Sequence, residues 1–151
     1  MLGEGVVAGF QMQDLRVTVL DGKHHPVDSK EVAFVTAARH AFEDAAAQAG
    51  PVVLEPIVRA EITVPNASVG DIAADLATRR GRVTGQSSLP GGRLAVSALV
   101  PLAELTDYPV RLKSLTAGDG AYTLDLSHYE MVPPRRQQEL SGAWVRHPRS
   151  A

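Results

Sequence analysis

The pattern of apolar and polar residues near the N-terminus predicts one strand followed by an exposed loop. Residues 15–20 (LRVTVL) alternate apolar and polar side chains, as half-buried strands do, and Asp21-Gly22 ends the alternation. Residues 23–27 (KHHPV) are polar and contain a proline, so we expect a surface loop. This loop is predicted to be held at one end by the strand and at the other by a helix.

The next stretch predicts a long amphipathic helix. Asp28 is placed to cap this helix, and Glu31, three residues later, completes a capping box. Gly50-Pro51 then ends the helical spacing. We expect the helix to hide one face against the rest of its unit. The predicted apolar face consists of Phe34, Ala38, Ala41, Phe42 and Ala45, and the polar face of Arg39, His40, Glu43 and Asp44.

A short apolar strand at 52–54 is predicted to complete a first unit that spans residues 1–57. Two strands and one helix bury too little apolar surface to be stable alone. We therefore expect further elements of this unit to precede Met1 in a longer protein. Glu55-Pro56 marks the join to the second unit.

A second unit, residues 58–132, is predicted to contain four strands and two helices. The strands are expected at 57–64, 82–86, 93–100 and 121–126. Pro90-Gly91-Gly92 is a natural turn between the middle two, which makes them an antiparallel hairpin. The order βαββαβ is that of the ferredoxin-like sandwich, whose four-stranded antiparallel sheet carries two helices on one face. The whole chain is therefore expected to be α+β.

Capping and breaking residues set the expected ends of the helices in this second unit. Ser68 and Asp71 stand in capping-box relation, and 79–81 (RRG) ends the first helix. Pro101 suits the first turn of the second helix, whose Leu102 and Leu105 should face inward, whereas Pro109 is expected to kink or end it. The tail, 133–151, is expected to form a short helix over 137–140, to offer Trp144 for packing, and to be disordered at its end.

Composition and charge narrow the class of protein. The chain has 151 residues, of which 44% are hydrophobic and 21% charged, and it has no cysteine, as expected for a globular protein of the reducing cytoplasm. No apolar run approaches the roughly 20 residues that span a membrane. Residues 1–57 carry four basic and eight acidic side chains, 58–132 carry seven and eight, and 133–151 carry four and one. A broad basic face for nucleic acid is therefore not expected, and any RNA contact must be local.

A search for catalytic motifs finds none, and no cofactor is expected. There is no phosphate-binding P-loop, nucleophile elbow, zinc-protease motif or calcium loop. His24 and His25 are adjacent, so their rings point to different sides of an extended chain and make a poor metal pair. The arginines at positions 79, 80 and 82 cluster at a helix end, where the helix dipole favours cations. The same arginines also suit phosphate oxygens, and the residues alone leave both interpretations open.

Several short blocks of sequence occur in a fixed order along the chain. They are VTVLDG (17–22), VDS (27–29) with AF (33–34), LEPI (54–57), GDI (70–72) with DL (75–76) and RRG (79–81), VPLAE (100–104), and SHYE (127–130) with VP (132–133). Each block is weak alone, but their order and spacing together are specific. Through these blocks the chain resembles bacterial elongation factor G, the translocation GTPase, over almost its whole length.

This resemblance places residues 1–57 in the C-terminal part of the family's fourth domain, which has a ribosomal-protein-S5-like βαβ fold. It implies that a GTPase domain, with its GTP and magnesium, lies upstream and that this fragment is not itself an enzyme. The family's fourth domain enters the decoding region beside transfer RNA and messenger RNA, and His25 aligns with the histidine of its tip loop. The tip contacts implied here are Gly22, Lys23, His24, His25 and Asp28.

The resemblance also makes residues 58–132 the family's fifth domain, which docks near the stalk base and the sarcin-ricin loop of the large ribosomal subunit. The ribosomal RNA contacts implied here are Arg79, Arg80, Arg82, Thr116, Gly118 and Gly120. This chain departs from the family in two places. It has Gly118-Asp119-Gly120 where the family commonly has Gly-Arg-Gly, with Ala117 in place of a glutamine. It also has Pro109 where the family has a continuous helix. An aspartate in this loop should weaken or alter the stalk-base contact. Together with Pro109 it indicates a paralogue that acts in ribosome recycling or under stress.

Two other functions remain open from the sequence. A ferredoxin-like module can bind a small regulatory ligand, and a ribosome-protection factor of the same family removes an antibiotic instead of moving transfer RNA. The histidine-bearing loop argues against the latter. The leading hypothesis is that the chain is a monomer that binds ribosomes and does not bind membranes.

Overall fold

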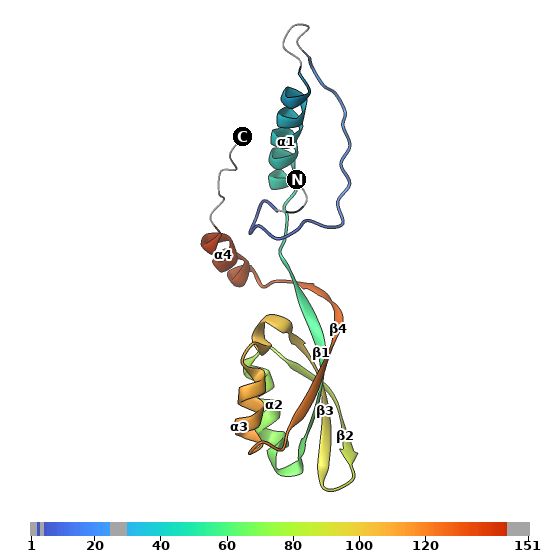
Figure 1. Cartoon of the computed structure of the whole chain (residues 1–151), viewed down its shortest axis with the longest axis vertical. Coiled ribbons are helices and arrows are strands. Elements are labelled where there is room, and N and C mark those ends of the chain that lie inside the picture. The colour runs from blue at the N-terminus through green and yellow to red at the C-terminus, as the bar shows by residue number, and fades with distance from the viewer. Residues whose placement is uncertain (1–2, 4, 25–29, 145–151) are drawn as a thin grey trace. The chain divides into compact units, whose positions relative to one another are not determined.

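The structure is a computed structural model that describes residues 3, 5–24 and 30–144 (Figure 1). The chain divides into two compact units. Unit 1 comprises Met1–Val53 and Val132–Ala151, and unit 2 comprises Leu54–Met131. No helix among the described residues is long and apolar enough to cross a membrane.

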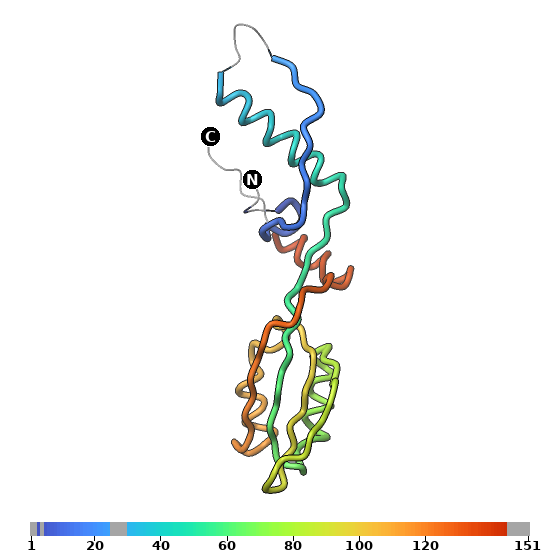
Figure 2. The backbone as a smooth tube through the Cα atoms, turned by 90° about the vertical axis from the view of Figure 1, so that its right-hand side faces the viewer, coloured from blue at the N-terminus to red at the C-terminus, as the bar shows by residue number. Residues whose placement is uncertain are grey.

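Unit 2 is an antiparallel sheet of four strands in the order β2-β3-β1-β4. Figures 1 and 2 show helices α2 and α3 together on one side of this sheet. The predicted βαββαβ order and ferredoxin-like fold are thereby confirmed. The strands are β1 (Leu54–Pro65), β2 (Arg82–Leu89), β3 (Arg93–Pro101) and β4 (Ala121–Met131), and the helices are α2 (Val69–Thr78) and α3 (Tyr108–Leu115), with short 3₁₀ helices η1 (Asn66–Ser68) and η2 (Leu102–Leu105).

The core of unit 2 lies between the sheet and these helices. Alternate residues of β1 and β3 point into it, because successive side chains of a strand face opposite sides. The core residues are Val58, Ala60, Ile62, Val64, Ile72, Leu76, Val96, Ala98, Val100, Leu105, Tyr108 and Leu112. Tyr108 packs edge to face on Tyr122 at 5.4 Å between ring centroids. Burying each large side chain stabilises the unit by about 1.5–3 kcal/mol.

The strands of unit 2 are longer than their alternation predicted. β1 begins at Leu54 and runs through Glu55-Pro56 without a break. The predicted separate strand at 52–54 and the predicted join at Glu55-Pro56 are therefore wrong. β4 continues past a bulge opposite Ile57/Val58 until Met131 pairs with Leu54. A proline is tolerated at Pro56 because the pairing of β1 with β3 starts only at Ile57, so at Pro56 a strand lies on one side only.

Residues 79–81 end helix α2, as predicted. Arg80 takes the left-handed conformation there, with φ 60°. The Gly81 N–H bonds the Leu76 carbonyl at 2.8 Å and the Arg80 N–H bonds the Ala77 carbonyl at 3.3 Å, which is a Schellman motif. Gly81 is required for space, since a Cβ there would lie 2.7 Å from the Leu76 carbonyl oxygen.

Other predicted caps in unit 2 are wrong in detail. Ser68 does occupy the N-cap of α2, but its side chain makes no capping hydrogen bond, because η1 already turns the backbone into helical geometry there. The expected helix from Pro101 is instead the short η2, with Leu105 buried and Leu102 exposed. Pro109 lies in the first turn of α3 and does not end a helix, because a first-turn proline loses no hydrogen bond.

Unit 1 contains one long helix, α1 (Glu31–Gln48), as predicted, with Gly50 at φ 69° just beyond its end. Its N-cap is Lys30, which makes no side-chain cap, and the predicted cap Asp28 lies outside the described residues. Most of the predicted apolar face is exposed, and Ala46 is the buried residue of the helix. The predicted strand 15–20 is not formed, because no described strand lies beside it to pair with, and Val19 and Leu20 are exposed.

The C-terminal segment forms helix α4 (Pro134–Ala143), longer than the 137–140 predicted. The Gln137 side-chain oxygen accepts a hydrogen bond of 2.9 Å from the Val53 N–H. Trp144 packs on Gly9, since a Cβ at Gly9 would lie 2.4 Å from the indole nitrogen. The predicted packing of Trp144 is confirmed, and the predicted disorder concerns residues outside the described range.

These glycine environments predict opposite effects of two substitutions. We expect Gly81→Ala to lower the free energy of unfolding by about 1–3 kcal/mol, because its Cβ has no room. Gly70→Ala is the matched control, since nothing lies within 4 Å and alanine favours a helix, so stability should stay equal or rise by up to about 1 kcal/mol. Urea unfolding of both variants measures the difference. Equal losses would contradict the assignment of Gly81.

Candidate functional site

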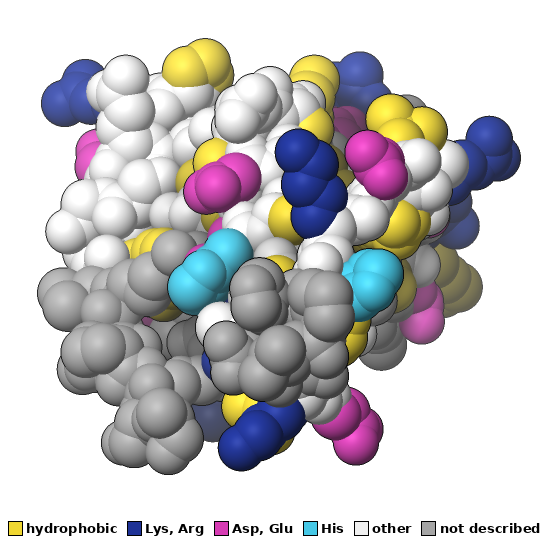
Figure 3. Space-filling view, turned by 90° about the horizontal axis from the view of Figure 1, so that it is seen from above, with side chains coloured by type: hydrophobic (Ala, Val, Ile, Leu, Met, Phe, Trp, Pro, Cys, Tyr) yellow, Lys and Arg dark blue, Asp and Glu magenta, His cyan; other side chains and the backbone are white. Residues whose placement is uncertain are grey.

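The predicted tip loop is exposed where the structure describes it. Gly22, Lys23 and His24 are all exposed, and the Gly22 N–H donates to Asp21 Oδ1 at 2.7 Å. His25 and Asp28, the other tip residues predicted from the sequence, lie outside the described residues. Figure 3, seen from above the view of Figure 1, shows histidine, basic and acidic side chains scattered over the visible surface. No described group of three His, Asp or Glu side chains is arranged to hold a metal ion.

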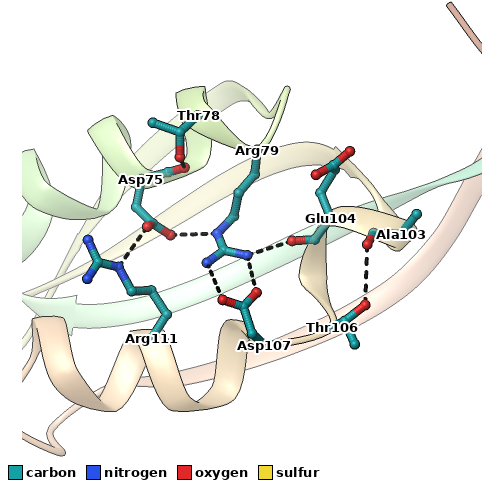
Figure 4. Close-up of polar contacts among 8 residues, drawn as sticks. All are labelled: Asp75, Thr78, Arg79, Ala103, Glu104, Thr106, Asp107 and Arg111. Carbon is teal, nitrogen blue, oxygen red and sulfur yellow. Dashed lines mark hydrogen bonds and ion pairs between the residues drawn. The ribbon is translucent and has the colours of Figure 1, made fainter. Parts of the chain in front are cut away.

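Arg79 lies in a dense network of contacts inside unit 2 (Figure 4). Its Nε donates to Asp75 at 2.7 Å, and its Nη1 donates to Asp107 at 2.6 Å and to the Glu104 carbonyl at 2.6 Å. The guanidinium also lies over the ring of Tyr108, 5.4 Å from its centroid. The hydrogen bond with Asp107 is the main reason that the pKa of Arg79 is raised, and it lowers the pKa of Asp107 in turn.

Asp75 joins the two helices at the centre of this network. Its side chain is only 7% exposed, and its second oxygen accepts from Arg111 Nε at 2.9 Å. Arg79 comes from the end of α2 and Arg111 from α3, so one carboxylate on α2 ties both helices together. A buried carboxylate is tolerated because two guanidinium groups satisfy it.

Arg80 makes the second part of the network. Its two Nη atoms form a bidentate pair with Glu55 at 2.6 and 2.8 Å, and its Nε donates to Glu104 at 3.1 Å. The hydrogen bonds to Glu55 are the main reason that the pKa of Arg80 is raised. An RNA phosphate would therefore have to compete with carboxylates for Arg79 and Arg80, and their predicted RNA contact stays a prediction. Arg82, by contrast, is exposed at the start of β2 and makes no ion pair with any described residue.

The loop 116–120 is held rigidly. Thr116 is buried and its hydroxyl donates to the Leu112 carbonyl at 2.8 Å, while Gly118 has φ 87°. Asp119 pairs with Arg93, a residue that sequence reasoning missed because 26 positions separate the two and only the sheet brings them together. The acidic charge that distinguishes this loop is thus neutralised within the unit.

Unit 2, a four-stranded antiparallel sheet with two helices on one face, belongs to the class of ferredoxin-like modules. The model of elongation factor G domain IV matches residues 1–72, and the model of the elongation factor G C-terminus matches residues 52–140. The chain belongs to the elongation factor G family, a family of translation factors.

A solved structure agrees with this assignment. The chain is 44% identical to a protein from Thermus thermophilus, with a TM-score of 0.77 over 93% of this chain. The match spans 21% of that protein, so this chain corresponds to about a fifth of its length.

The Asp75 network predicts a large and specific loss of stability. We expect Asp75→Asn to lower the free energy of unfolding by about 1–3 kcal/mol, because it leaves two guanidinium groups facing a neutral amide in a buried site. Glu139→Gln breaks an exposed pair with Arg136 and should change stability by less than about 0.5 kcal/mol. Chemical denaturation compares them, and similar effects would contradict the assigned role of Asp75.

Tyr108 predicts a defined dependence on alkaline pH. Burial raises the pKa of Tyr108 to about 12, and its hydroxyl has no partner among the described residues. The folded state therefore binds this proton more tightly than the unfolded state, in which the pKa has its ordinary value of about 10. The resulting contribution of Tyr108 to the free energy of unfolding is complete below about pH 10 and is lost as the pH rises toward 12.

Tyr108→Phe should remove that part of the alkaline loss. At neutral pH its stability should stay within about 1 kcal/mol of the wild type, because no hydrogen bond is lost. Tyr129→Phe, at an exposed tyrosine, should keep the wild-type pH profile. Unfolding free energies between pH 8 and 12 decide between the two, and a Tyr108→Phe profile identical to the wild type would refute this explanation.

Proposed function

We propose that this chain is the ribosome-binding region of an elongation factor G-like translational GTPase that acts in the cytoplasm. In this proposal the region serves the translocation of transfer RNA and messenger RNA, or ribosome recycling if the protein is a paralogue. GTP and magnesium would bind elsewhere in the full protein, and this region acts as a monomer without chemistry of its own. The single observation that carries the proposal is the match of two successive elongation factor G segments over residues 1–140.

The loop from Gly22 to Asp28 is the proposed contact with transfer RNA and messenger RNA. Its described part, Gly22, Lys23 and His24, is exposed, and α1 begins shortly after it at Glu31. An ammonium group and imidazoles in such a loop bind phosphate and sugar oxygens, which position a protein on RNA without reading its sequence. His25 and Asp28 are proposed to belong to the same contact.

Unit 2 is the proposed contact with ribosomal RNA near the stalk base. The residues proposed from family resemblance are Arg79, Arg80, Arg82, Thr116, Gly118 and Gly120. Thr116 and Gly118 support this proposal through shape, since both fix the loop 116–120 in one conformation. Asp119 is paired with Arg93. The proposed stalk-base contact of this loop therefore depends less on charge than the contact of a loop with an arginine at position 119.

Co-sedimentation with ribosomes at increasing salt tests the tip contact. The wild-type chain should bind with a salt-dependent affinity, and Lys23→Ala with His25→Ala should weaken binding at least about tenfold, because charged hydrogen bonds to RNA are lost. Arg16→Ala with His40→Ala removes one exposed cation and one exposed histidine from the same unit and should leave binding unchanged. Absence of any ribosome association at low salt would overturn the proposed function.

A further inference from the structure

The arginines of unit 2 differ sharply in whether they are free to bind a ligand. Four of them have carboxylate partners inside the unit: Arg79, Arg80, Arg93 and Arg111. Arg59 and Arg82 are exposed and make no ion pair with the described part of the chain. Of the unit's arginines, these two have guanidinium groups that no described carboxylate holds in an ion pair.

Arg59 and Arg82 lie on the same face of the sheet. Arg59 is flanked by the buried core residues Val58 and Ala60, so its side chain points to the opposite face. Both arginines pair in register with Leu99 of β3, one from β1 and one from β2. Because neighbouring strands are about 4.8 Å apart, the two side chains start about 10 Å apart on either side of Leu99.

The face beside these arginines bears mostly small side chains. The next row along the strands consists of Gly85, Ser97, Glu61 and Thr123, and the row after it of Ser87, Ala95, Thr63 and Ala121. Helices α2 and α3 both cover the other face (Figures 1 and 2). Within unit 2 a nucleic-acid backbone can therefore approach this sheet surface closely.

The acidic residues of this face lie on β1 and β4, on the side away from Arg82. Glu61 accepts a hydrogen bond of 2.8 Å from the Ser97 hydroxyl. Asp125 stands opposite Arg59 on the edge strand β4, and Arg93 is paired with Asp119. The position between Arg59 and Arg82 is thus flanked by cations on both sides, with Asp125 on the far side of Arg59.

We propose that this open face of the unit 2 sheet, centred on Arg59 and Arg82, binds the sugar-phosphate backbone of ribosomal RNA. The inference rests on the proposed ribosome binding and specifies the cations through which unit 2 achieves it. Guanidinium groups bind phosphate oxygens with two parallel hydrogen bonds, and two such groups on either side of Leu99 can each hold a phosphate of one backbone. A protein partner fits less well, because the face lacks the aromatic anchors on which protein interfaces depend.

The salt dependence of ribosome binding tests this proposal with the whole chain. Arg59→Gln with Arg82→Gln should weaken binding and reduce the slope of log affinity against log salt by about 1.4–1.8, since each phosphate contact contributes about 0.7–0.9. Lys113→Gln is the matched control, because this exposed cation lies on α3, on the opposite face, and it should leave the slope unchanged. All three positions are exposed, and thermal unfolding should show that the variants stay folded.

The two failures are distinguishable. If the wild type does not bind ribosomes, the proposed function falls and this inference with it. If the wild type binds and the double arginine variant binds with the same affinity and slope, the inference alone is overturned.

Directed cleavage identifies the class of molecule that the face meets. The chain has no cysteine, so Ser87→Cys creates one attachment point for an iron chelate on the open face, and Ser114→Cys creates one on α3. The label at position 87 should cleave ribosomal RNA at sites that the label at 114 does not reach. Cleavage confined to ribosomal protein from position 87 would overturn the proposal.

Discussion

Unit 2 depends on the pairing of β1 with a neighbour on each side. This strand lies between β3 and β4, so the alternation of its side chains decides what each face of the sheet can do. Val58, Ala60, Ile62 and Val64 provide the floor on which both helices pack, while the residues between them face away. One period-two pattern thereby creates the core and leaves the opposite surface available for contacts.

The charged residues of unit 2 include some that hold the fold together and others that make no ion pair with the described residues. Asp75, Asp107, Glu104 and Glu55 bind Arg79 and Arg80 where α2 ends, and these ion pairs link α2, α3, η2 and the start of β1. The net charge of unit 2 is close to zero because these opposite charges cancel, although they form many ion pairs inside the unit. These ion pairs also explain why the count of arginines in the sequence is a poor guide to RNA binding, since internal carboxylates compete for most of them.

The sequence was sufficient to predict unit 2 because each signal there acts locally. Alternation, the Pro90-Gly91-Gly92 turn and the glycine near the end of α2 gave the element order, and the order determines a known topology. Strand ends and caps were predicted less well, because they depend on partners far along the chain: β4 reaches Met131 only because Leu54 pairs with it. The same limit applies to Asp119, whose partner Arg93 the sheet supplies, and to residues 15–20, whose alternation forms no strand without a neighbour.

The bulge between β1 and β4 has a consequence for solubility. β4 is an edge strand, and its second half displays Leu126, Tyr129 and Met131 to water, which is the composition that invites a foreign strand to add on. At Ile57/Val58 the ladder shifts by one residue, so the outward N–H and C=O groups of β4 do not form one continuous series. A second chain finds two short, mismatched docking edges where a regular strand would have offered one long edge, and this irregularity protects the protein from edge-to-edge aggregation.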